Sequence, residues 1–365
     1  MIWQFIFGGL LYIRANISLN MRNISILFLL AMSLSANAQS LSKPSFERLR
    51  KVEDSMKVYS KKMIMDRTAL QRFLADSIFI RMLVRGLKTT NSFYYSFDSL
   101  ETVSKLYAPD STFRIFTWQF MRDEDYYRQR GAIQMRTADG SLKLFPLVDM
   151  SDFTQKPIDS IRTAQNWIGA IYYGIVMKTY GDKKYYTLIG YDDNKMRSVK
   201  KWIEVLSFDE QGKPQFGGPF FNIPNNDIKG ATVQARFCLE YKKDGRARMN
   251  FDKDLDMIVY EHLVSEDNQP DKPYTFIPDG DYQGFKWING RWIQVDKVFN
   301  YKLLDGQAPM PSPLKDAVGK NDEEKLMQQS EKNRKKTPAT PPPFKQPVDK
   351  QPMEKKPTVE HEDSN

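Results

Sequence analysis

Histidine and cysteine, which supply many of the bases, nucleophiles and transition-metal ligands in proteins, are scarce in this sequence. The chain of 365 residues contains two histidines, His262 and His361, and a single cysteine, Cys238. The spacings H-x-x-x-H, C-x-x-C and G-x-S-x-G are absent, and so is a Gly-rich phosphate loop. We therefore predict no catalytic residue, no cofactor-binding residue and no metal ligand, and we expect His262 to be structural.

Alternating aspartates in the segment 252–256 have the spacing of a calcium-binding loop, in which such carboxylates converge on one ion. The pattern fails at the sixth position, which is Met257 instead of glycine, and at the twelfth, which is Leu263 instead of glutamate. We interpret the segment as a solvated connection between two strands. The Asp-Asp-Asn run at 192–194 is interpreted as a turn, with a ligand cluster as the alternative.

The sequence suggests one pair of side chains as a binding platform, Trp287 and Trp292. The segment 285–298 has the pattern of a hairpin turned at Asn289-Gly290, and this turn places the two tryptophans opposite each other. Their rings would stack on sugar rings, or, as the alternative, the pair closes a hydrophobic core. Two carboxylates for glycoside hydrolysis are a further alternative, because their separation in space cannot be read from a sequence.

Strands dominate the elements that must position these residues. Three β-type runs at 172–178, 184–189 and 199–208 are separated by short connections, the first of them Gly181-Asp182. Connections this short allow antiparallel pairing only, because a parallel pair needs a long crossover. The run 113–120 is apolar on both sides and is therefore predicted to be a central strand.

A hairpin is predicted around Asp139-Gly140, a pair of residues typical of the two-residue type I′ turn. Counting outward from that turn places Met135 opposite Leu144. The alternate residues of its strands would then form one buried and one solvated face.

The segment 231–242 has the cleanest alternation of apolar and polar residues in the chain. We predict that it forms one strand, with Arg236 and Cys238 on its polar side. Cys238 is therefore expected to be accessible to solvent rather than part of the core.

Helical periodicity is confined to the region before the strands. Apolar residues recur at steps of three and four over 46–63 and again over 66–87. Asp98 and Glu101 form a capping-box pattern for a short third helix that ends before Pro109.

These patterns predict a mainly β protein of the α+β class. N-terminal helices in the segment 39–108 pack on a large antiparallel β-meander at 109–305. The meander forms a barrel, a sandwich or a partial propeller.

The formal net charge of +9 and the isoelectric point near 9.2 raise the question of an anionic partner, either nucleic acid or a membrane surface. Charges of both signs are interspersed along the chain. We interpret the excess as a solvated basic surface and predict no nucleic-acid partner.

An export signal stands near the N-terminus. Met21-Arg22-Asn23 is followed by an apolar run over 24–34 and then by the small-x-small sequence Ala36-Asn37-Ala38. We expect a signal peptide at 21–38, cleaved between Ala38 and Gln39, and a mis-assigned extension at 1–20. The alternative is a membrane hairpin built from this run and the apolar stretch before it.

Cleavage would leave no integral membrane segment and place the protein in the periplasm or outside the cell. The residue after Ala38 is not cysteine, so no lipid anchor is expected there. A single cysteine also rules out an internal disulfide, so an ordinary hydrophobic core must stabilise the domain.

The segment 306–365 differs in composition from the rest of the chain. It holds half of the 20 prolines, nearly balanced charges and few apolar residues. Such a composition buries too little apolar surface to offset the entropy of ordering, so we predict a disordered tail that acts as a spacer.

The region 92–297 contains six blocks in series: SFDSLETVSKLYAPDSTFRIFTWQF, GAIQMRTADGSLKLFPLVD, WIGAIYYGIV, KYYTLIGYDDN, KWIEVLSFDEQGKPQFGGPFF and MIVYEHL. In this order the blocks resemble an uncharacterised family of exported, β-rich proteins of Gram-negative bacteria with no assigned function. The resemblance implies one continuous domain and residence in the periplasm or outside the cell. It implies no catalytic residue.

Together these features predict a non-catalytic exported envelope protein that binds a protein partner or a surface glycan. The alternative is a carboxylate-dependent hydrolase that acts on envelope polymers. A concave pocket that gathers two or more acids in contrasting surroundings would favour the enzyme.

Overall fold

The structure, a computed structural model, describes residues 40–123, 126–225 and 230–299, together with 327, 328 and 331. Residues 1–300 and 301–365 form separate units, and almost all of the described residues belong to the first. The predicted extension at 1–20 and the signal peptide at 21–38, with its cleavage site at Ala38 and Gln39, lie outside the described residues. So does the predicted tail at 306–365, apart from the three isolated positions.

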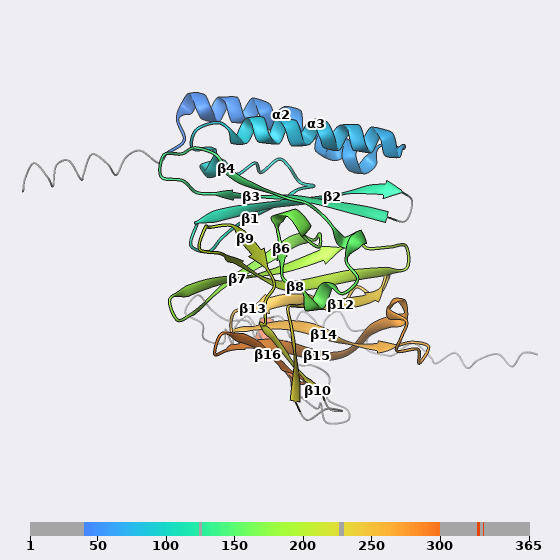
Figure 1. The fold of residues 1–365 in the computed structure, drawn as a ribbon. Coiled ribbons are helices and arrows are strands. Elements are labelled where there is room, and N and C mark those ends of the chain that lie inside the picture. Colours follow the sequence, from blue (N-terminus) through green and yellow to red (C-terminus); the bar gives the residue numbers. More distant parts are fainter. Residues whose placement is uncertain (1–39, 124–125, 226–229, 300–326, 329–330, 332–365) are drawn as a thin grey trace, which may run out of the picture. The chain divides into compact units, whose positions relative to one another are not determined.

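The described residues up to 299 form a pair of helices followed by three β-sheets, stacked one on the next (Figure 1). Separate apolar cores lie between successive layers. Strands of the first and second sheets therefore carry apolar side chains on both faces. A sheet with only one buried face would instead show apolar and polar residues in alternation. The predicted mainly β fold of the α+β class, with N-terminal helices packed on antiparallel sheets, is confirmed.

The two helices are α2, Lys43–Met65, and α3, Ala69–Leu87. Each begins at a hydroxyl side chain that accepts a hydrogen bond from a backbone N–H of the first turn, Ser42 in α2 and Thr68 in α3. The inner faces of the helices pack on the first sheet through Leu49, Met56, Met63, Phe79 and Leu83. Neither of them, nor any other helix among the described residues, is long and apolar enough to cross a membrane.

The first sheet consists of the antiparallel strands β1 (Ser104–Tyr107), β2 (Phe113–Asp123), β3 (Tyr126–Met135) and β4 (Lys143–Leu147), in that order. Strand β2 lies between β1 and β3, as its double apolar pattern predicts. Its side chains Phe116, Trp118 and Phe120 join the core beneath the helices, whereas Phe113 and Ile115 join the core shared with the second sheet.

The predicted third helix does not form. Asp98 and Glu101 lie in a pair of turns, after which the chain enters β1 at Ser104. The backbone N–H of Ser99 donates to the Glu53 carboxylate of α2 at 2.7 Å. Because the acceptor for this N–H comes from another helix, the turns dock on α2 and do not continue as a helix. The β region therefore begins inside the segment 39–108, which the sequence pattern assigns to helices.

The β3–β4 hairpin has a register one residue away from the predicted one. Met135 pairs with Lys143, and every pair along the hairpin shifts with it. A type I′ turn needs a positive φ at both central residues, but in the pair Asp139-Gly140 only the glycine has one, at 71°. The Asp139 carboxylate instead accepts hydrogen bonds from the N–H and the hydroxyl of Ser141, and the last pair of the ladder before the loop is Met135 with Lys143.

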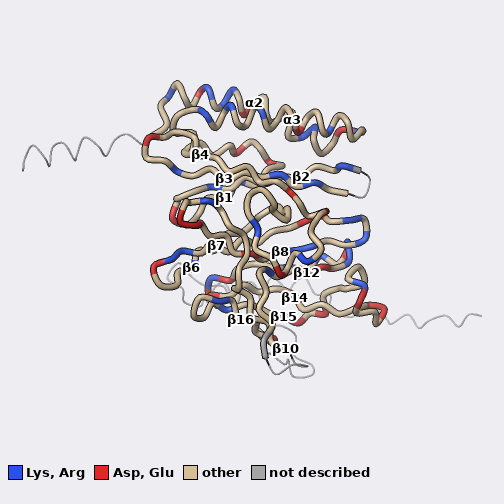
Figure 2. The backbone as a smooth tube through the Cα atoms, in the orientation of Figure 1, with Lys and Arg blue, Asp and Glu red and all other residues tan. Residues whose placement is uncertain are grey.

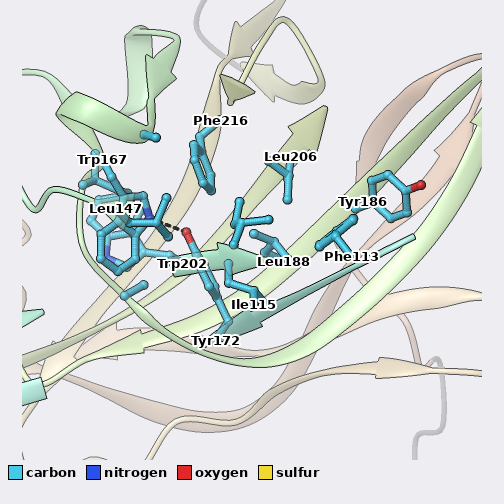
Figure 3. Close-up of a cluster of buried hydrophobic side chains, with 14 of the residues drawn as sticks. Phe113, Ile115, Leu147, Trp167, Tyr172, Tyr186, Leu188, Trp202, Leu206 and Phe216 are labelled. Carbon is cyan, nitrogen blue, oxygen red and sulfur yellow. Dashed lines mark hydrogen bonds between the residues drawn. The ribbon is translucent and has the colours of Figure 1, made fainter. Parts of the chain in front are cut away.

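The second sheet contains the three predicted antiparallel strands as β6 (Ile171–Tyr180), β7 (Lys183–Asp192) and β8 (Ser198–Phe208). The short strands β5 (Arg162–Thr163), β9 (Pro214–Phe216) and β12 (Arg236–Lys242) complete it, in the order β5-β9-β8-β7-β6 with β12 paired to β8. One face, with Leu188, Trp202 and Leu206, packs on the first sheet (Figure 3). The other face, with Ile189 and Ile203, packs on the third sheet.

The segment predicted as one strand at 231–242 is divided between two sheets. Strand β11 (Gly230–Gln234) belongs to the third sheet and β12 to the second. Arg236, predicted on the polar side, is completely buried, and its Nε lies 3.1 Å from Oε2 of Glu204 on β8. A buried guanidinium needs a buried partner, and the change of sheet at Ala235 brings Arg236 beside that partner.

The third sheet contains β10 (Phe221–Asn225), β11, β13 (Met249–Asp252), β14 (Met257–Ser265), β15 (Phe276–Ile288) and β16 (Arg291–Val295). Its order is β11-β10-β16-β15-β14-β13. Among these strands β10 and β16 pair in parallel, which departs from the predicted antiparallel meander. The β15–β16 hairpin has the predicted register, because Asn289 and Gly290 have φ values of 49° and 79°, as a type I′ turn requires.

Candidate binding site

The two tryptophans predicted as a binding platform face each other across β15 and β16, but Trp292 does not reach the surface. It is completely buried, and its Nε1 donates to Oγ1 of Thr187 at 2.9 Å. Trp287 is half-buried, with its ring stacked on Phe220 and in edge-to-face contact with Trp292. The geometry is that of a pair that closes a core, so the two rings do not offer adjacent free faces to a ligand.

His262 and Cys238 both make structural contacts. Nδ1 of His262, on β14, lies 2.7 Å from Oδ2 of Asp279 on β15. Cys238 is half-buried and packs against the core between the first and second sheets. Burial raises the pKa of its thiol, so the accessibility expected of Cys238 is found only in part.

The aspartates at 252–256 form a turn. Oδ1 of Asp252 accepts hydrogen bonds from the N–H groups of Asp254 and Leu255, and Asp256 pairs with Lys178 of β6. In the part of the chain that the structure describes, no three acidic, histidine or cysteine side chains converge in a way that could hold a metal ion.

A polar pocket of about 310 Å³ lies between the first and second sheets. Its walls come from β3, from the 3₁₀ helix η3 (Ser151–Phe153), from the end of β7 and from β8. Aromatic rings, carboxylates, amides and ammonium groups meet there, among them Tyr126, Tyr127, Gln129, Asp152, Asp192, Asn194, Lys200 and Trp202. Since acids from two separate segments converge, this pocket is the candidate binding site.

Asp192, the last residue of β7, is the more buried of the two acids, with 8% of its surface exposed. Its Oδ1 accepts hydrogen bonds from Nε2 of Gln129 at 2.6 Å and from the N–H of Asn194 at 2.8 Å. Burial raises the pKa of Asp192 to about 6, and the nearby Asp149 acts in the same direction, while the two hydrogen bonds and Lys200 oppose the rise. The group can therefore exist in both its protonated and its charged form near neutral pH.

A second buried carboxylate, Asp149, fixes the wall behind Asp192. It is completely buried, and its Oδ1 accepts from the N–H and the hydroxyl of Ser151 at 3.0 and 2.7 Å. Its Oδ2 accepts from the N–H of Gln129 at 3.1 Å. Asp149 thus holds the backbone of Gln129, whose side chain in turn holds Asp192.

Gly169 makes room for this arrangement. It has a positive φ of 76°, which favours glycine. A Cβ at this position would lie 2.9 Å from the Asp149 carboxylate and 3.0 Å from Oε1 of Gln129. The close approach of the chain at Gly169 therefore depends on the absence of a side chain.

The other acid, Asp152, has different surroundings. Its side chain is 35% exposed and lies 2.9 Å from Nη1 of Arg128. It also accepts a hydrogen bond from the hydroxyl of Tyr126, and burial together with this bond raises the pKa of that hydroxyl to about 12. Asp152 is thus an ion-paired carboxylate at the edge of the pocket, whereas Asp192 is a buried one with a raised pKa.

Trp202 contributes a donor without a partner. The side chain lines the pocket and is 4% exposed, and none of the described residues accepts a hydrogen bond from its Nε1. A buried N–H left without an acceptor costs about 1–3 kcal/mol. Trp202 therefore brings to the wall of the pocket a donor that is unpaired within the described part of the chain.

The pocket presents donors and acceptors within one small volume. Asp152 and Asp192 accept hydrogen bonds, Trp202 and Lys200 donate them, and Tyr126 adds an aromatic ring. Charges of both signs are present, so the site matches a polar ligand that both donates and accepts rather than a simple ion.

Sequence reasoning found one part of this site, because it named 192–194 as a turn with a ligand cluster as the alternative. It missed Gln129, Asp152 and Trp202, which come from different strands and from η3. One signal in the sequence could have pointed to the site. Asp192 lies four residues after Leu188 on β7 and therefore on the same face, which packs on the first sheet, and an acid on such a face is unusual.

Comparisons of the chain with protein families, with curated proteins and with solved structures found no match. The resemblance to exported Gram-negative proteins therefore depends on the six blocks of sequence alone. The pocket has to be interpreted from its own geometry.

Proposed function

We propose that this protein is an exported, non-catalytic envelope protein that binds a surface glycan, and that one sugar unit occupies the polar pocket. The export signal before Gln39 and the resemblance to exported Gram-negative proteins support residence in the periplasm or outside the cell. The absence of a phosphate loop and of histidine-based motifs supports a binding role rather than one of the common catalytic ones.

The observation that carries the proposal is that one pocket is lined both by Trp202, whose Nε1 has no acceptor among the described residues, and by the buried carboxylate of Asp192. A sugar hydroxyl accepts from an indole N–H and donates to a carboxylate, because each hydroxyl has one proton and two lone pairs. Adjacent hydroxyls on one ring can engage both groups at once. A tyrosine ring such as Tyr126 adds an apolar surface for the C–H face of the sugar.

The size of the pocket favours one sugar unit over a protein segment. Its volume of about 310 Å³ stands at the lower end of the range for small-molecule sites, which is about 300–1,000 Å³. A protein partner would instead need an interface of about 800 Å² on each side. The glycan is therefore preferred over the protein partner as the occupant of this site.

Isothermal titration calorimetry of the full chain with a panel of neutral sugars, amino sugars and uronic acids tests the proposal. We expect at least one of them to bind with a Kd of about 1 mM or below. Trp202→Phe and Asp192→Ala should weaken that binding at least about tenfold, since each removes a buried hydrogen bond. Lys183→Gln, at the exposed start of β7, is the matched control and should leave the binding unchanged. Absence of saturable binding across the panel would refute the proposal.

One observation favours a second candidate, a carboxylate-dependent hydrolase that acts on envelope polymers. The pocket gathers two acids in contrasting surroundings, since Asp192 has a pKa of about 6 while Asp152 is partly exposed and paired with Arg128. Glycosidases use such a pair, with the acid of raised pKa as proton donor to the leaving oxygen and the other as base or nucleophile. Asp192 and Asp152 would take these roles.

The release of new reducing ends from oligosaccharides that bind distinguishes the two candidates. A binding protein releases none, and its Asp192→Asn variant changes affinity only. If the parent chain released reducing ends, and Asp192→Asn and Asp152→Asn each abolished the release, the hydrolase would be established and the non-catalytic proposal rejected.

A further inference from the structure

The net positive charge of the chain is concentrated on the helices. Residues 43–88, which include α2 and α3, carry twelve Lys and Arg against five Asp and Glu, whereas residues 89–365 carry forty of each. Two of the five acids, Glu53 and Asp76, are buried beneath the helices. Figure 2 shows the result, with blue segments along both helices and few red ones.

Most of the helical cations are exposed and have no acidic partner. Among the basic side chains of 43–88, Arg50 alone forms an ion pair with another described residue, and that residue is Glu47 of the same helix. Lys61, Lys62 and Arg67, around the turn between α2 and α3, are exposed. An exposed positive surface without neutralising partners attracts an anionic one.

Large apolar side chains are exposed at the same turn. The exposed fraction is 38% for Ile64, 78% for Met65, 69% for Leu70 and 55% for Leu74. Leu70 and Leu74 are one helical turn apart on α3, so they lie on the same face. We call these four residues, together with Lys61, Lys62 and Arg67, the helical tip. A group of exposed apolar side chains ringed by charges is typical of an interaction surface.

We propose that the helical tip docks on an anionic phospholipid surface. Its apolar side chains would enter the boundary between headgroups and acyl chains, and its three cations would lie at the level of the phosphates. This inference offers an alternative to the interpretation of the charge as a merely solvated surface, because the excess is gathered on residues 43–88. It does not depend on the pocket, which lies on the other side of the first sheet.

Nucleic acid is the other anionic partner that cations attract, and the composition of the helical tip argues against it. Contacts with phosphates need cations but gain nothing from exposed leucine and methionine. Binding to single strands uses aromatic rings that stack on bases, whereas Ile64, Met65, Leu70 and Leu74 are not aromatic. The combination of aliphatic and basic side chains matches a lipid interface.

Vesicle flotation with the full chain tests the proposal, using vesicles of phosphatidylcholine alone and vesicles in which about a third of the lipid is phosphatidylglycerol. Two variants alter the tip: Lys61→Gln/Lys62→Gln/Arg67→Gln removes its charge, and Leu70→Gln/Leu74→Gln removes apolar surface. Their matched controls, on exposed residues of the sheets and their connections, are Lys183→Gln/Lys253→Gln/Lys286→Gln and Ile161→Gln/Ile288→Gln. All chains share residues 1–38, so differences between them do not arise there.

The parent should bind the anionic vesicles and bind the neutral ones far more weakly. Each basic residue near an anionic surface contributes about fivefold, so the triple tip variant should lose on the order of a hundredfold in binding. The apolar tip variant should lose about tenfold or more. Lys61→Arg/Lys62→Arg, which keeps the charge, and both controls should stay within about twofold of the parent.

Two results would overturn the proposal. One is equal binding by the parent, the tip variants and their controls, provided that their melting temperatures agree. The other is tight binding of duplex DNA that the charge variant loses and the apolar variant keeps, because the helical cations would then serve nucleic acid.

Discussion

Arg236 and Glu204 form a completely buried ion pair, with Nε of the guanidinium 3.1 Å from Oε2 of the carboxylate. The two residues are also partners in the register of β12 and β8. Arg236 donates further hydrogen bonds to the carbonyl oxygens of Ser160 at 2.8 Å and Phe216 at 3.2 Å, and Glu204 accepts one from the hydroxyl of Tyr172. The pair therefore ties β12 to the segment that follows η3 and to the core of the second sheet.

Removing one partner of this pair should destabilise the fold strongly. Glu204→Leu leaves the Arg236 guanidinium buried without its carboxylate, which costs about 3–5 kcal/mol in the free energy of unfolding. The double variant Glu204→Leu/Arg236→Met should recover most of the loss, because both charges are then gone. Urea denaturation measures both effects.

The control for this prediction is the surface pair Lys242–Glu266, whose side chains are 40% and 39% exposed. Lys242→Ala should cost far less than Glu204→Leu, because an exposed ion pair is screened by solvent and contributes little to stability. An equal cost for Glu204→Leu and Lys242→Ala would show that burial of the first pair has no energetic consequence.

Asp192 should make stability depend on pH. Its pKa is raised by burial from 3.8 to about 6, so between these values the folded chain binds more protons than the unfolded one. The free energy of unfolding should therefore fall as the pH rises through this window. One pKa unit corresponds to about 1.4 kcal/mol. Ionisation of Asp192 should therefore lower the free energy of unfolding by about 3 kcal/mol between acidic and neutral pH.

Asp192→Asn isolates this effect, because the amide keeps an acceptor for Gln129 and Asn194 but does not titrate. The difference in unfolding free energy between variant and parent, measured in urea at pH 4, 5, 6 and 7, should grow in favour of the variant as the pH rises. A difference that stays constant over this range would contradict the raised pKa.

Gly169→Ala should damage the wall of the pocket. A Cβ at Gly169 would lie 2.9 Å from the Asp149 carboxylate, and the positive φ of 76° disfavours alanine by about 1–2 kcal/mol. Gly181→Ala is the matched control, because Gly181 also has a positive φ, at 56°, but a Cβ there meets nothing within 4 Å. We expect Gly169→Ala to cost at least about 2 kcal/mol more than Gly181→Ala in urea denaturation. Equal costs would mean that Asp149 and Gln129 move aside freely.

Local turn chemistry explains where the sequence predicted the fold correctly and where it did not. Asn289-Gly290 adopts the type I′ turn that its residue types favour, and so the register of Trp287 and Trp292 is correct. Asp139-Gly140 has equally favourable types, but the Asp139 side chain bonds Ser141 and the register shifts by one residue. A side-chain hydrogen bond of this kind competes with the turn and has no signature in the alternation of strands.

Tertiary partners explain the remaining differences. The alternation at 231–242 is real, but Arg236 finds its counter-charge on β8, and so the strand changes sheet. Asp192 was the only residue of the pocket that the sequence pointed to. Gln129 and Trp202 come from other strands, β3 and β8, and line the pocket together with Asp192 only in the folded chain. Residues of the first and second sheets come together in this pocket because the two sheets pack on each other. No single segment of the sequence contains that information.

The most direct test of the central claim is the NMR signal of the Trp202 indole N–H during titration with the sugar that binds in calorimetry. Trp202→Phe assigns the signal by removing it. If a sugar accepts a hydrogen bond from Nε1, the signal should shift and saturate at the calorimetric Kd, while that of Trp292, whose Nε1 is bonded to Thr187 at 2.9 Å, should stay in place. A Trp202 signal that does not move while the sugar binds would place the glycan elsewhere on the protein and contradict the account of the pocket.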